Sequence, residues 1–390
     1  MTAPFCDLRF CTVRSLAVIA TIAAFMIPVS LRAAVINVPA SQSTIQAGVN
    51  AALSGDTVLV APGTYTGTGN FNIDSAGKNI TIKSSGGAAG TIIDMTGASP
   101  INQKHAFNIH NGETVTINGF TIKNGYFANG AITVADSTLT ITQCIFTGNT
   151  SVLYGGALTI VQNNASVAVT VQQSQFISNT AGDLTSNSGL GGAIEALVNS
   201  SNGVETVNIV NSTFVGNTAS YDGGAIDISG LGTASPTVTI TNSSFYGNNA
   251  NGFVASGSGL PAPVSGKAPG AVDSFQDAVT ITNTILWGDS TSAEYSTLNN
   301  PATSGLGSLS IKFSDVQGGF TGNGNFNANP LYLNQAGGDL RLTANSPAIR
   351  AGTTTGAPTV DLLGNSRGSN PDVGAYQFTG KKRTGQITSQ

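Results

Sequence analysis

A carboxylate recurs at one place in a short repeated phrase. "GGAIEA" contains Glu195, "GGAIDI" contains Asp227 and "GAVDSF" contains Asp273, whereas an earlier copy has Thr159 at this place. If these phrases form adjacent strands of one sheet, the three carboxylates stand about 5 Å apart. A carboxyl pair at that separation can carry out retaining glycoside hydrolysis, and carboxylate oxygens bind calcium. The third interpretation is a solvated polar face, on which water and salt screen the repulsion.

The apolar neighbours of these carboxylates set the face on which they lie. Ile194, Ile226 and Val272 are expected to point into the core, so the acidic column is expected to point outward. Like charges so close repel one another, which raises a pKa or attracts a cation. The column therefore supplies the candidate catalytic residues and the candidate calcium ligands. Asp222, just before "GGAID", is a further candidate for ligand binding.

Few other residues of the chain are candidates for catalysis or metal binding. His105 and His110, both in "KHAFNIHNG", are the two histidines of the chain, and they could form part of a base or a metal site or simply contact solvent. A polysaccharide lyase needs a base, for which pectate lyases typically use arginine or lysine with calcium. No arginine lies between Arg32 and Arg341, and no lysine falls beside the acidic column in the repeat alignment.

A second phrase precedes each copy of the first. The clearest versions are "LTITQCIFTGN", "VTVQQSQFISN", "VNIVNSTFVGN" and "VTITNSSFYGN". Their large apolar residue recurs at intervals of 24 to 41 residues, at Ile122, Phe146, Phe176, Phe214, Phe245, Leu286 and Val316. Such a period is typical of a solenoid whose length variation lies in loops.

The local period decides which solenoid to expect. "VTITNSSF" alternates apolar and polar residues, which is typical of a strand with one buried face, and helical spacing is absent from the repeats. Strands of successive units must then pair in parallel. The sequence therefore predicts an all-β fold, a single-stranded right-handed parallel β-helix. A β-propeller is the alternative, although its units are usually more regular.

Two further columns of the repeat predict the corner after the first strand. One column reads Gly119, Gln143, Gln173, Asn211, Asn242, Asn283 and Phe313. Asparagine and glycine favour the left-handed backbone that a sharp corner needs, and stacked amides can bond along the column. The next column is mostly small and contains Cys144, which we therefore expect to be a packed, unreactive thiol.

The chain divides into four segments. Residues 1–33 read as a signal peptide, with Arg9 and Arg14 before an apolar run that ends near a small-residue cleavage site; an uncleaved anchor is the alternative. Residues 34–328 form the β-helix, 329–380 the C-terminal coils and cap, and 381–390 a tail. Within 41–56, Ser43 and Gln46 fit a capping box, which predicts a short N-terminal capping helix with Ile45, Val49 and Leu53 as its apolar stripe.

The amino-acid composition limits the kinds of molecule that the protein is expected to bind. Only 9% of the residues are charged, the formal net charge is −4 and no basic stripe exists, so no nucleic-acid partner is expected. Beyond the leader, no segment could span a membrane as a helix. We expect a monomeric protein that is secreted or displayed at the cell surface.

The repeats resemble known families. The Phe-x-x-Asn motifs that begin at Phe146, Phe176, Phe214 and Phe245, interleaved with Gly-Gly-Ala, resemble the paired repeats of polymorphic outer-membrane proteins. "STIQAGVNAALSGDTVLVAPGTY" is similar to the start of bacterial pectate-lyase-like β-helix proteins. Asn329–Phe378 resembles the choice-of-anchor Q region, in which Asp361, Arg367 and Asp372 match the pattern as a charge cluster closing the last coils.

The resemblance implies a secreted or surface-attached β-helix, and some members of these groups are adhesins. The expected function is non-catalytic adhesion or glycan binding, with a polysaccharide or a cell-surface glycan as partner. The alternative is a carbohydrate-active enzyme, a polysaccharide lyase or glycoside hydrolase that uses the acidic column. A purely structural envelope protein is the third interpretation. No cofactor other than calcium is expected.

Overall fold

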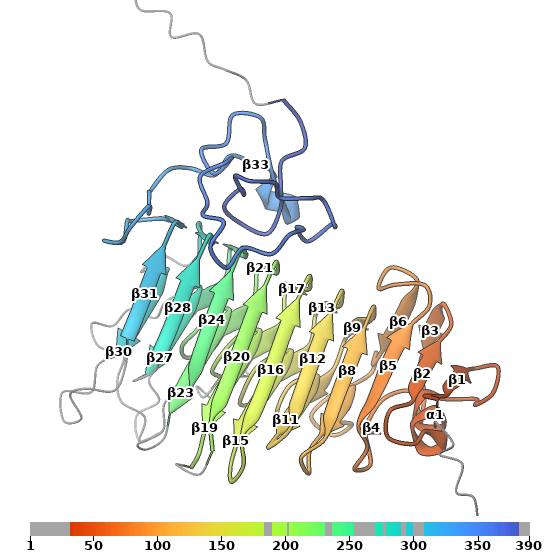
Figure 1. Ribbon diagram of the computed structural model, residues 1–390. Helices are drawn as coiled ribbons and strands as arrows, with labels where there is room; N and C mark the ends of the chain where they lie inside the picture. Colours follow the sequence, from red (N-terminus) through yellow and green to blue (C-terminus); the bar gives the residue numbers. More distant parts are fainter. Residues whose placement is uncertain are drawn as a thin grey trace, which may run out of the picture. The chain divides into compact units, whose positions relative to one another are not determined.

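The chain winds into coils whose strands stack as long parallel sheets (Figure 1). This computed structural model describes residues 32–182, 189–200, 203–230, 236–252, 270–275, 278–289, 294–298 and 308–381. Each strand pairs in parallel with its counterparts in neighbouring coils. The fold is thus the predicted right-handed parallel β-helix, and the β-propeller alternative is wrong. Almost all of the predicted signal peptide and most of the tail lie outside the described residues.

Four sheets make up the coils. The first sheet contains β1 (Val35–Val38), β2 (Thr57–Val60), β5 (Ile80–Ser84), β8 (Thr114–Asn118), β12 (Thr138–Thr142), β16 (Val167–Gln172), β20 (Glu205–Val210), β24 (Thr237–Thr241), β28 (Ala278–Thr282) and β31 (Ser308–Lys312). The second contains β3 (Gly63–Tyr65), β6 (Thr91–Asp94), β9 (Thr121–Lys123), β13 (Ile145–Thr147), β17 (Gln175–Ile177), β21 (Thr213–Val215), β25 (Ser244–Tyr246), β29 (Ile285–Leu286) and β32 (Asp315–Val316).

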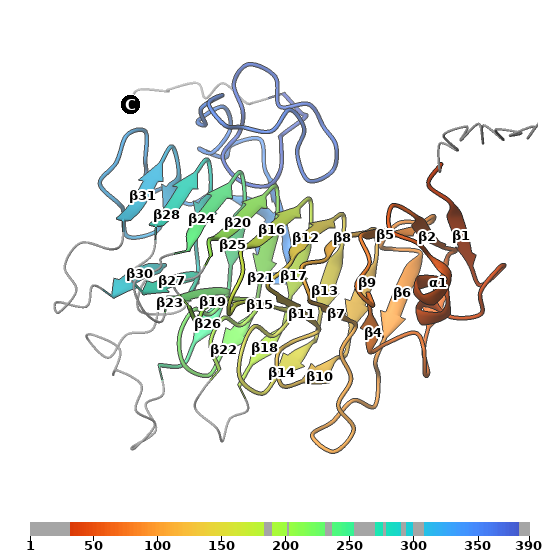
Figure 2. The same cartoon turned by 60° about the horizontal axis from the view of Figure 1, so that its bottom comes forward.

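The other two sheets complete each coil. The third sheet contains β4 (Ile73–Asp74), β7 (Phe107–Ile109), β11 (Ile132–Ala135), β15 (Leu158–Gln162), β19 (Ile194–Val198), β23 (Ile226–Gly230), β27 (Val272–Phe275) and β30 (Tyr295–Leu298). The fourth sheet consists of short strands, which Figure 2 brings forward: β10 (Tyr126–Phe127), β14 (Thr150–Ser151), β18 (Thr180–Ala181), β22 (Thr218–Ala219) and β26 (Asn249–Ala250).

The phenylalanines of the repeat form a stack inside the coils. Phe146, Phe176, Phe214 and Phe245 are fully buried and occupy one register position of the second sheet. Successive rings lie nearly parallel, with centroids 4.8, 4.8 and 4.6 Å apart. The ring spacing equals the strand spacing of a sheet, so each coil must lie in register on the one before it.

The corner column behaves as the sequence predicts. Asn211, Asn242 and Asn283 have φ of 48°, 48° and 52°, and the other four members of the column also have positive φ. The amide of Asn283 donates to Asn242 Oδ1 at 3.2 Å, so the predicted bonding along the column occurs there. In the next column Cys144 is buried, and burial raises the pKa of its thiol to about 11, which agrees with an unreactive role.

The asparagine of Phe-x-x-Asn forms a second, buried column. Asn149, Asn179, Asn217 and Asn248 each donate through Nδ2 to the Oδ1 of the next member, and Asp289 accepts from Asn248 at the end. Each of these amides also donates to a backbone carbonyl of the preceding coil, as Asn217 does to Phe176. The column therefore ties neighbouring coils together where no strand pairing does.

A short helix covers the first coil, as expected, but its cap differs from the prediction. Helix α1 (Ile45–Ala51) begins after Thr44, whose hydroxyl accepts from the amide of Ala47 at 3.2 Å, so Ser43 is not the N-cap. Ile45 and Val49 are buried against the core, whereas Leu53 lies beyond the helix and is exposed. Gln46 instead bonds with the backbone of Asp74, which ties the helix to β4.

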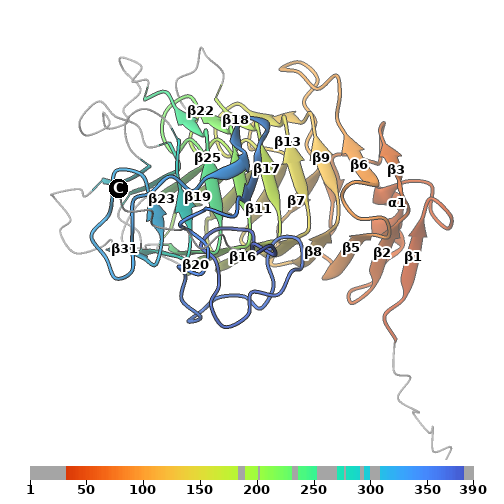
Figure 3. The same ribbon diagram turned by 90° about the horizontal axis from the view of Figure 1, so that it is seen from above.

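The C-terminal segment packs beside the coils rather than extending them. Its regular part is the antiparallel pair β33 (Tyr332–Asn334) and β34 (Asp339–Leu342), joined by a single 3-10 turn, η2 (Gln335–Gly337). Figure 3 shows this segment from above, next to β16 and β20. It contacts the corner column, because Gln173 and Asn211 donate to the carbonyls of Asp361 and Val360. The sequence predicts instead that this segment closes the last coils, so its observed position differs from the prediction.

Arg367 holds this segment in place. Its guanidinium is buried and donates to Asn211 Oδ1 at 2.7 Å and to the carbonyls of Asp372, Gly374 and Ala375. Burial lowers the pKa of Arg367 to about 10, although the nearby carboxylates of Asp361 and Asp372 oppose this. The charge cluster that the sequence predicts is therefore structural, and it works through Arg367 rather than through direct ion pairs.

Arg367→Ala is expected to loosen the C-terminal segment. The change removes charge-assisted hydrogen bonds and leaves the carbonyl of Gly374 and Oδ1 of Asn211 without a donor, which costs about 3 kcal/mol. Limited proteolysis followed by mass spectrometry would show earlier cleavage within residues 329–381. Arg341→Ala is the matched control, because Arg341 pairs with Asp339 at the surface and such pairs contribute little. Equal cleavage of the two variants would contradict the role given to Arg367.

Candidate functional site

The third sheet brings the acidic column together in the predicted order. Thr159 is paired with Glu195, Glu195 with Asp227 and Asp227 with Asp273, each on adjacent strands. Neighbouring carboxylates therefore occupy successive rungs of one sheet face. The register is the one expected from aligning the phrases.

The predicted exposure of the column is wrong. Glu195, Asp227 and Asp273 are only 0, 2 and 3% exposed, and Asp222 is also buried. The turn before β23 folds back over the outer face: a Cβ on Gly223 would come within 2.7 Å of the Cβ of Asp227. Glycine is required there by this close approach, and its φ of 62° also favours glycine. This turn therefore covers Asp227, and all three carboxylates of the column are buried.

Burial makes the charged form of these carboxyl groups unfavourable. It raises the pKa of Glu195 and of Asp273, and the charge of Asp227 raises both further. Burial and Asp227 raise the pKa of Asp222 to about 7. The pKa of Asp227 is also raised by burial, against the hydrogen bond that Ser229 donates. None of the ion pairs formed by the described residues involves this column.

This geometry restricts what the column can do. A polymer cannot reach side chains that are covered by the turn, so catalysis by Glu195, Asp227 and Asp273 has no support from the structure. Both carboxylate oxygens of Glu195 are buried without a hydrogen-bond partner. The same is true of one carboxylate oxygen in each of Asp222 and Asp273. In the described part of the chain, however, no three members of the column come close enough to share one ion.

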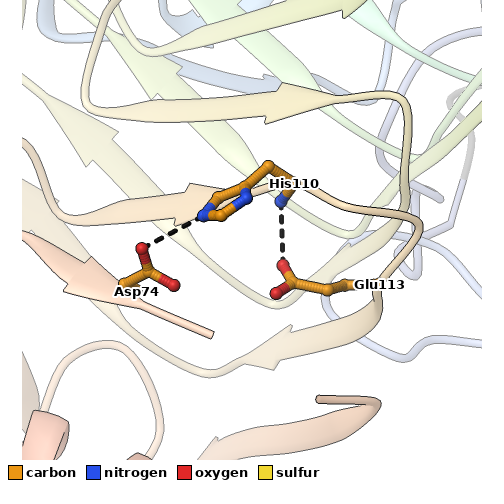
Figure 4. A group of neighbouring side chains, drawn as sticks. All are labelled: Asp74, His110 and Glu113. Carbon is orange, nitrogen blue, oxygen red and sulfur yellow. Dashed lines mark hydrogen bonds and ion pairs between the residues drawn. The ribbon is translucent and has the colours of Figure 1, made fainter. Parts of the chain in front are cut away.

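A second group of titratable side chains lies near the N-terminal end of the β-helix. Asp74, His110 and Glu113 each offer one ligand atom within 4.8 Å of the others (Figure 4). His110 Nε2 lies 3.0 Å from Asp74 Oδ2, and the bond with Asp74 raises the pKa of His110 while His110 helps to lower that of Asp74. The side chains of His110 and Asp74 are 29% and 48% exposed, so this pair reaches solvent.

The two histidines of the sequence therefore have different environments. His105 lies outside the group; its ring packs against Phe127, and burial lowers its pKa. Sequence reasoning missed Asp74 and Glu113, because the first coils lack the repeat phrases and no alignment column relates these two residues. The Gln46 contacts that orient Asp74 are likewise visible only in the folded chain.

A groove beside the C-terminal segment is the third candidate. It has a volume of ≈ 370 Å³ and lies between the second sheet and β34. Gln175, Val215, Asp339, Arg341 and Tyr376 are among the residues that line it. The guanidinium of Arg341 donates three hydrogen bonds to the carboxylate of Asp339, so the two charges largely balance each other.

Comparison with known proteins finds only distant structural likenesses. No protein-family model matches the chain, and no curated protein matches it. Among solved structures, pectate lyase Pel9A matches with a TM-score of 0.34 and 16% identity, over 88% of this chain and 96% of that one. A mutant of the PL6 family alginate lyase AlyGC matches with a TM-score of 0.25 and 12% identity, over 89% of this chain and 58% of that one.

The described residues contain no helix that is long and apolar enough to cross a membrane. Secretion by the predicted signal peptide, and the likeness of the repeats and of the C-terminal region to named families, remain predictions.

Proposed function

We propose that this protein is an extracellular, non-catalytic glycan-binding β-helix that holds a polysaccharide on the outer face of its first sheet. The observation that carries the proposal is a column of small polar side chains in register across nine strands. Its members are Thr57, Thr81, Thr116, Thr140, Thr170, Asn208, Thr239, Thr280 and Ser310. Each is at least partly exposed.

The chemistry of this column suits a sugar polymer. A threonine hydroxyl both donates and accepts hydrogen bonds, as sugar hydroxyls do. Strands in a sheet lie about 4.8 Å apart, so the column repeats identical groups at a constant interval and suits a ligand that itself repeats. The sheet is held by parallel pairing along its whole length, so little ordering is needed on binding. Figure 1 shows the strands of this sheet side by side with the C-terminal segment beyond their ends.

The burial of the acidic column also favours binding over catalysis. Glu195, Asp227 and Asp273 were the residues on which an enzymatic function would have rested, and all three are buried. A binding surface needs no such residue.

Co-sedimentation with insoluble polysaccharides tests the proposal. Cellulose, chitin, xylan and peptidoglycan would be incubated with the full chain, and the double variant Thr140→Glu with Thr239→Glu is expected to bind at least about tenfold more weakly, because the added carboxylates lose hydration on contact. The control is Thr147→Glu, in the same coil as Thr140 but on the second sheet. Binding to none of the polysaccharides, or equal losses in both variants, would count against the first sheet as the site.

A carbohydrate-active enzyme is the second candidate, and one observation favours it. The hydrogen-bonded pair of Asp74 and His110 reaches solvent and could supply acid–base chemistry. The same polysaccharide incubations would be assayed for unsaturated products and new reducing ends. Product formation that His110→Asn abolishes would establish the enzyme; its absence would leave the binding function alone.

A further inference from the structure

We propose that Asp74, His110 and Glu113 bind one divalent transition-metal ion, of which zinc is the representative. The three residues come from two successive coils. Asp74 ends β4, His110 follows β7, and Glu113 precedes β8. The proposal concerns the N-terminal coils and is independent of glycan binding on the first sheet.

The distances suit an ion of this kind. One ligand atom from each residue lies within 4.8 Å of the other two, and the Asp74–His110 contact is 3.0 Å. Zinc binds nitrogen and oxygen at about 2.0–2.2 Å in tetrahedral geometry, which places ligand atoms about 3.3 Å from one another. An ion can therefore enter with only small side-chain movements and replace the direct bond between Asp74 and His110.

Asp74 is oriented before any ion arrives. Its Oδ1 accepts from the amide of Ala76 at 2.7 Å, which leaves Oδ2 directed toward His110. Its backbone amide donates to Gln46 Oε1 at 2.8 Å. Ala76 has φ of 57°, a left-handed conformation that brings its amide round to the carboxylate. Bonds of this sort are the outer-shell contacts that orient metal ligands.

Glu113 is held in the same way from the next coil. Its oxygens accept from the hydroxyl of Ser75 and from the amides of Gly77 and His110, the last at 2.8 Å. These donors come from both turns that carry the other two ligands, so Glu113 fixes the turns relative to each other. Oε2 accepts from both Ser75 and His110, whereas Oε1 accepts only the amide of Gly77. A carboxylate oxygen has more than one lone pair, so Oε1 can still coordinate an ion.

The donor set and its surroundings favour a transition metal over calcium. One imidazole nitrogen with two carboxylates suits zinc and its neighbours, whereas calcium takes six or more oxygen ligands. Two carboxylates face the site, and the nearby ammonium of Lys78 is directed to the carbonyls of Val49 and Asn50. The partial exposure of Asp74 and His110 leaves the remaining coordination position open to water.

Isothermal titration of the full chain with zinc chloride, after dialysis against a chelator, tests this. We expect one ion per chain, with binding weakened at least about tenfold in Asp74→Asn and His110→Asn. His105→Asn is the matched control, because His105 lies outside the group and should leave the affinity unchanged. Circular dichroism would confirm that each variant is folded.

Cobalt(II) provides a second readout that a purely structural role would not change. Its visible absorption should show tetrahedral coordination in the wild-type chain and in His105→Asn, and lose this signature in His110→Asn. The proposal is overturned if zinc does not bind, if His110→Asn binds zinc as tightly as the wild type does, or if calcium binds the site more tightly than zinc.

Discussion

The folded protein is expected to lose several kcal/mol of stability as the pH rises from about 5 to about 8, the reverse of ordinary acid denaturation. The cause is a set of buried carboxyl groups. Burial raises the pKa of Glu205 to about 8, that of Asp315 to about 7, and, together with Asp227, that of Asp222 to about 7. Burial also raises the pKa of six other acids: Glu195, Asp227, Asp273, Asp289, Glu294 and Asp372.

The direction of this pH dependence follows from the numbers of protons that the folded and unfolded states bind. An acid whose pKa is higher in the folded state keeps its proton there at pH values where the unfolded chain has lost it. The folded state therefore binds more protons than the unfolded state between about pH 4 and pH 8, so stability falls as pH rises through this window. For Glu205, a rise from 4.5 to about 8 corresponds to about 4 kcal/mol lost by pH 8.

Urea denaturation at pH 5, 6, 7 and 8 measures this effect. The midpoint should fall with pH in the wild type, and Glu205→Gln should flatten the fall. Asp339→Asn is the control, because Asp339 pairs with Arg341 and its pKa is lowered, so it does not titrate in this range. A midpoint that is constant or rises with pH in the wild type would refute the expectation.

The same titration tests calcium binding by the acidic column. We propose that calcium added at pH 8 raises the midpoint, because a cation held by two neighbouring carboxylates of the column would offset part of their negative charge. The triple variant Glu195→Gln, Asp227→Asn, Asp273→Asn should not respond to calcium, and it should exceed the wild type in stability at pH 8 without it. A calcium response that survives in the triple variant would locate the ion elsewhere.

Asn217→Ala is expected to destabilise the protein by about 4 kcal/mol. Asn217 Oδ1 accepts from both the backbone amide and the side-chain amide of Asn179, at 3.0 Å each. Its own amide donates to Phe176 O and to Asn248 Oδ1, at 3.0 and 2.8 Å. Alanine removes four hydrogen bonds. It leaves the backbone amide of Asn179 buried without an acceptor, whereas Asn248 Oδ1 keeps the backbone amide of residue 217 as a donor. Each such group costs about 1–3 kcal/mol, and some relaxation of neighbouring coils reduces the sum.

Equilibrium urea denaturation at pH 5, which lies below the raised pKa values of Glu205, Asp222 and Asp315, separates this effect from their titration. The control is Asn164→Ala, because Asn164 is exposed and should change stability by no more than about 0.5 kcal/mol. If Asn217→Ala cost less than about 1 kcal/mol, the asparagine column would not be a major link between coils.

Much of the fold could be predicted because its causes are local and repeated. The alternation in "VTITNSSF" specifies a strand with one buried face, and its recurrence requires strands of successive coils to pair. The positive φ of Asn242 and the stacked rings of Phe176 and Phe214 follow from the same columns. The position of the helix could be predicted, but its first residue could not, because Ser43 and Thr44 are adjacent and both residue types are suitable N-caps. In the structure the hydroxyl of Thr44 accepts from the amide of Ala47, so Thr44 is the N-cap.

The candidate sites also have some features that follow from the repeat and others that do not. The positions of Glu195, Asp227 and Asp273 on adjacent strands could be predicted from the sequence, because the strand register follows from the repeat. Their burial could not be predicted, because it depends on how the rest of the chain packs over this face of the sheet. The proximity of Asp74 to His110 and Glu113 could not be predicted either. These residues meet because the coils stack, and stacking brings together positions that share no sequence pattern.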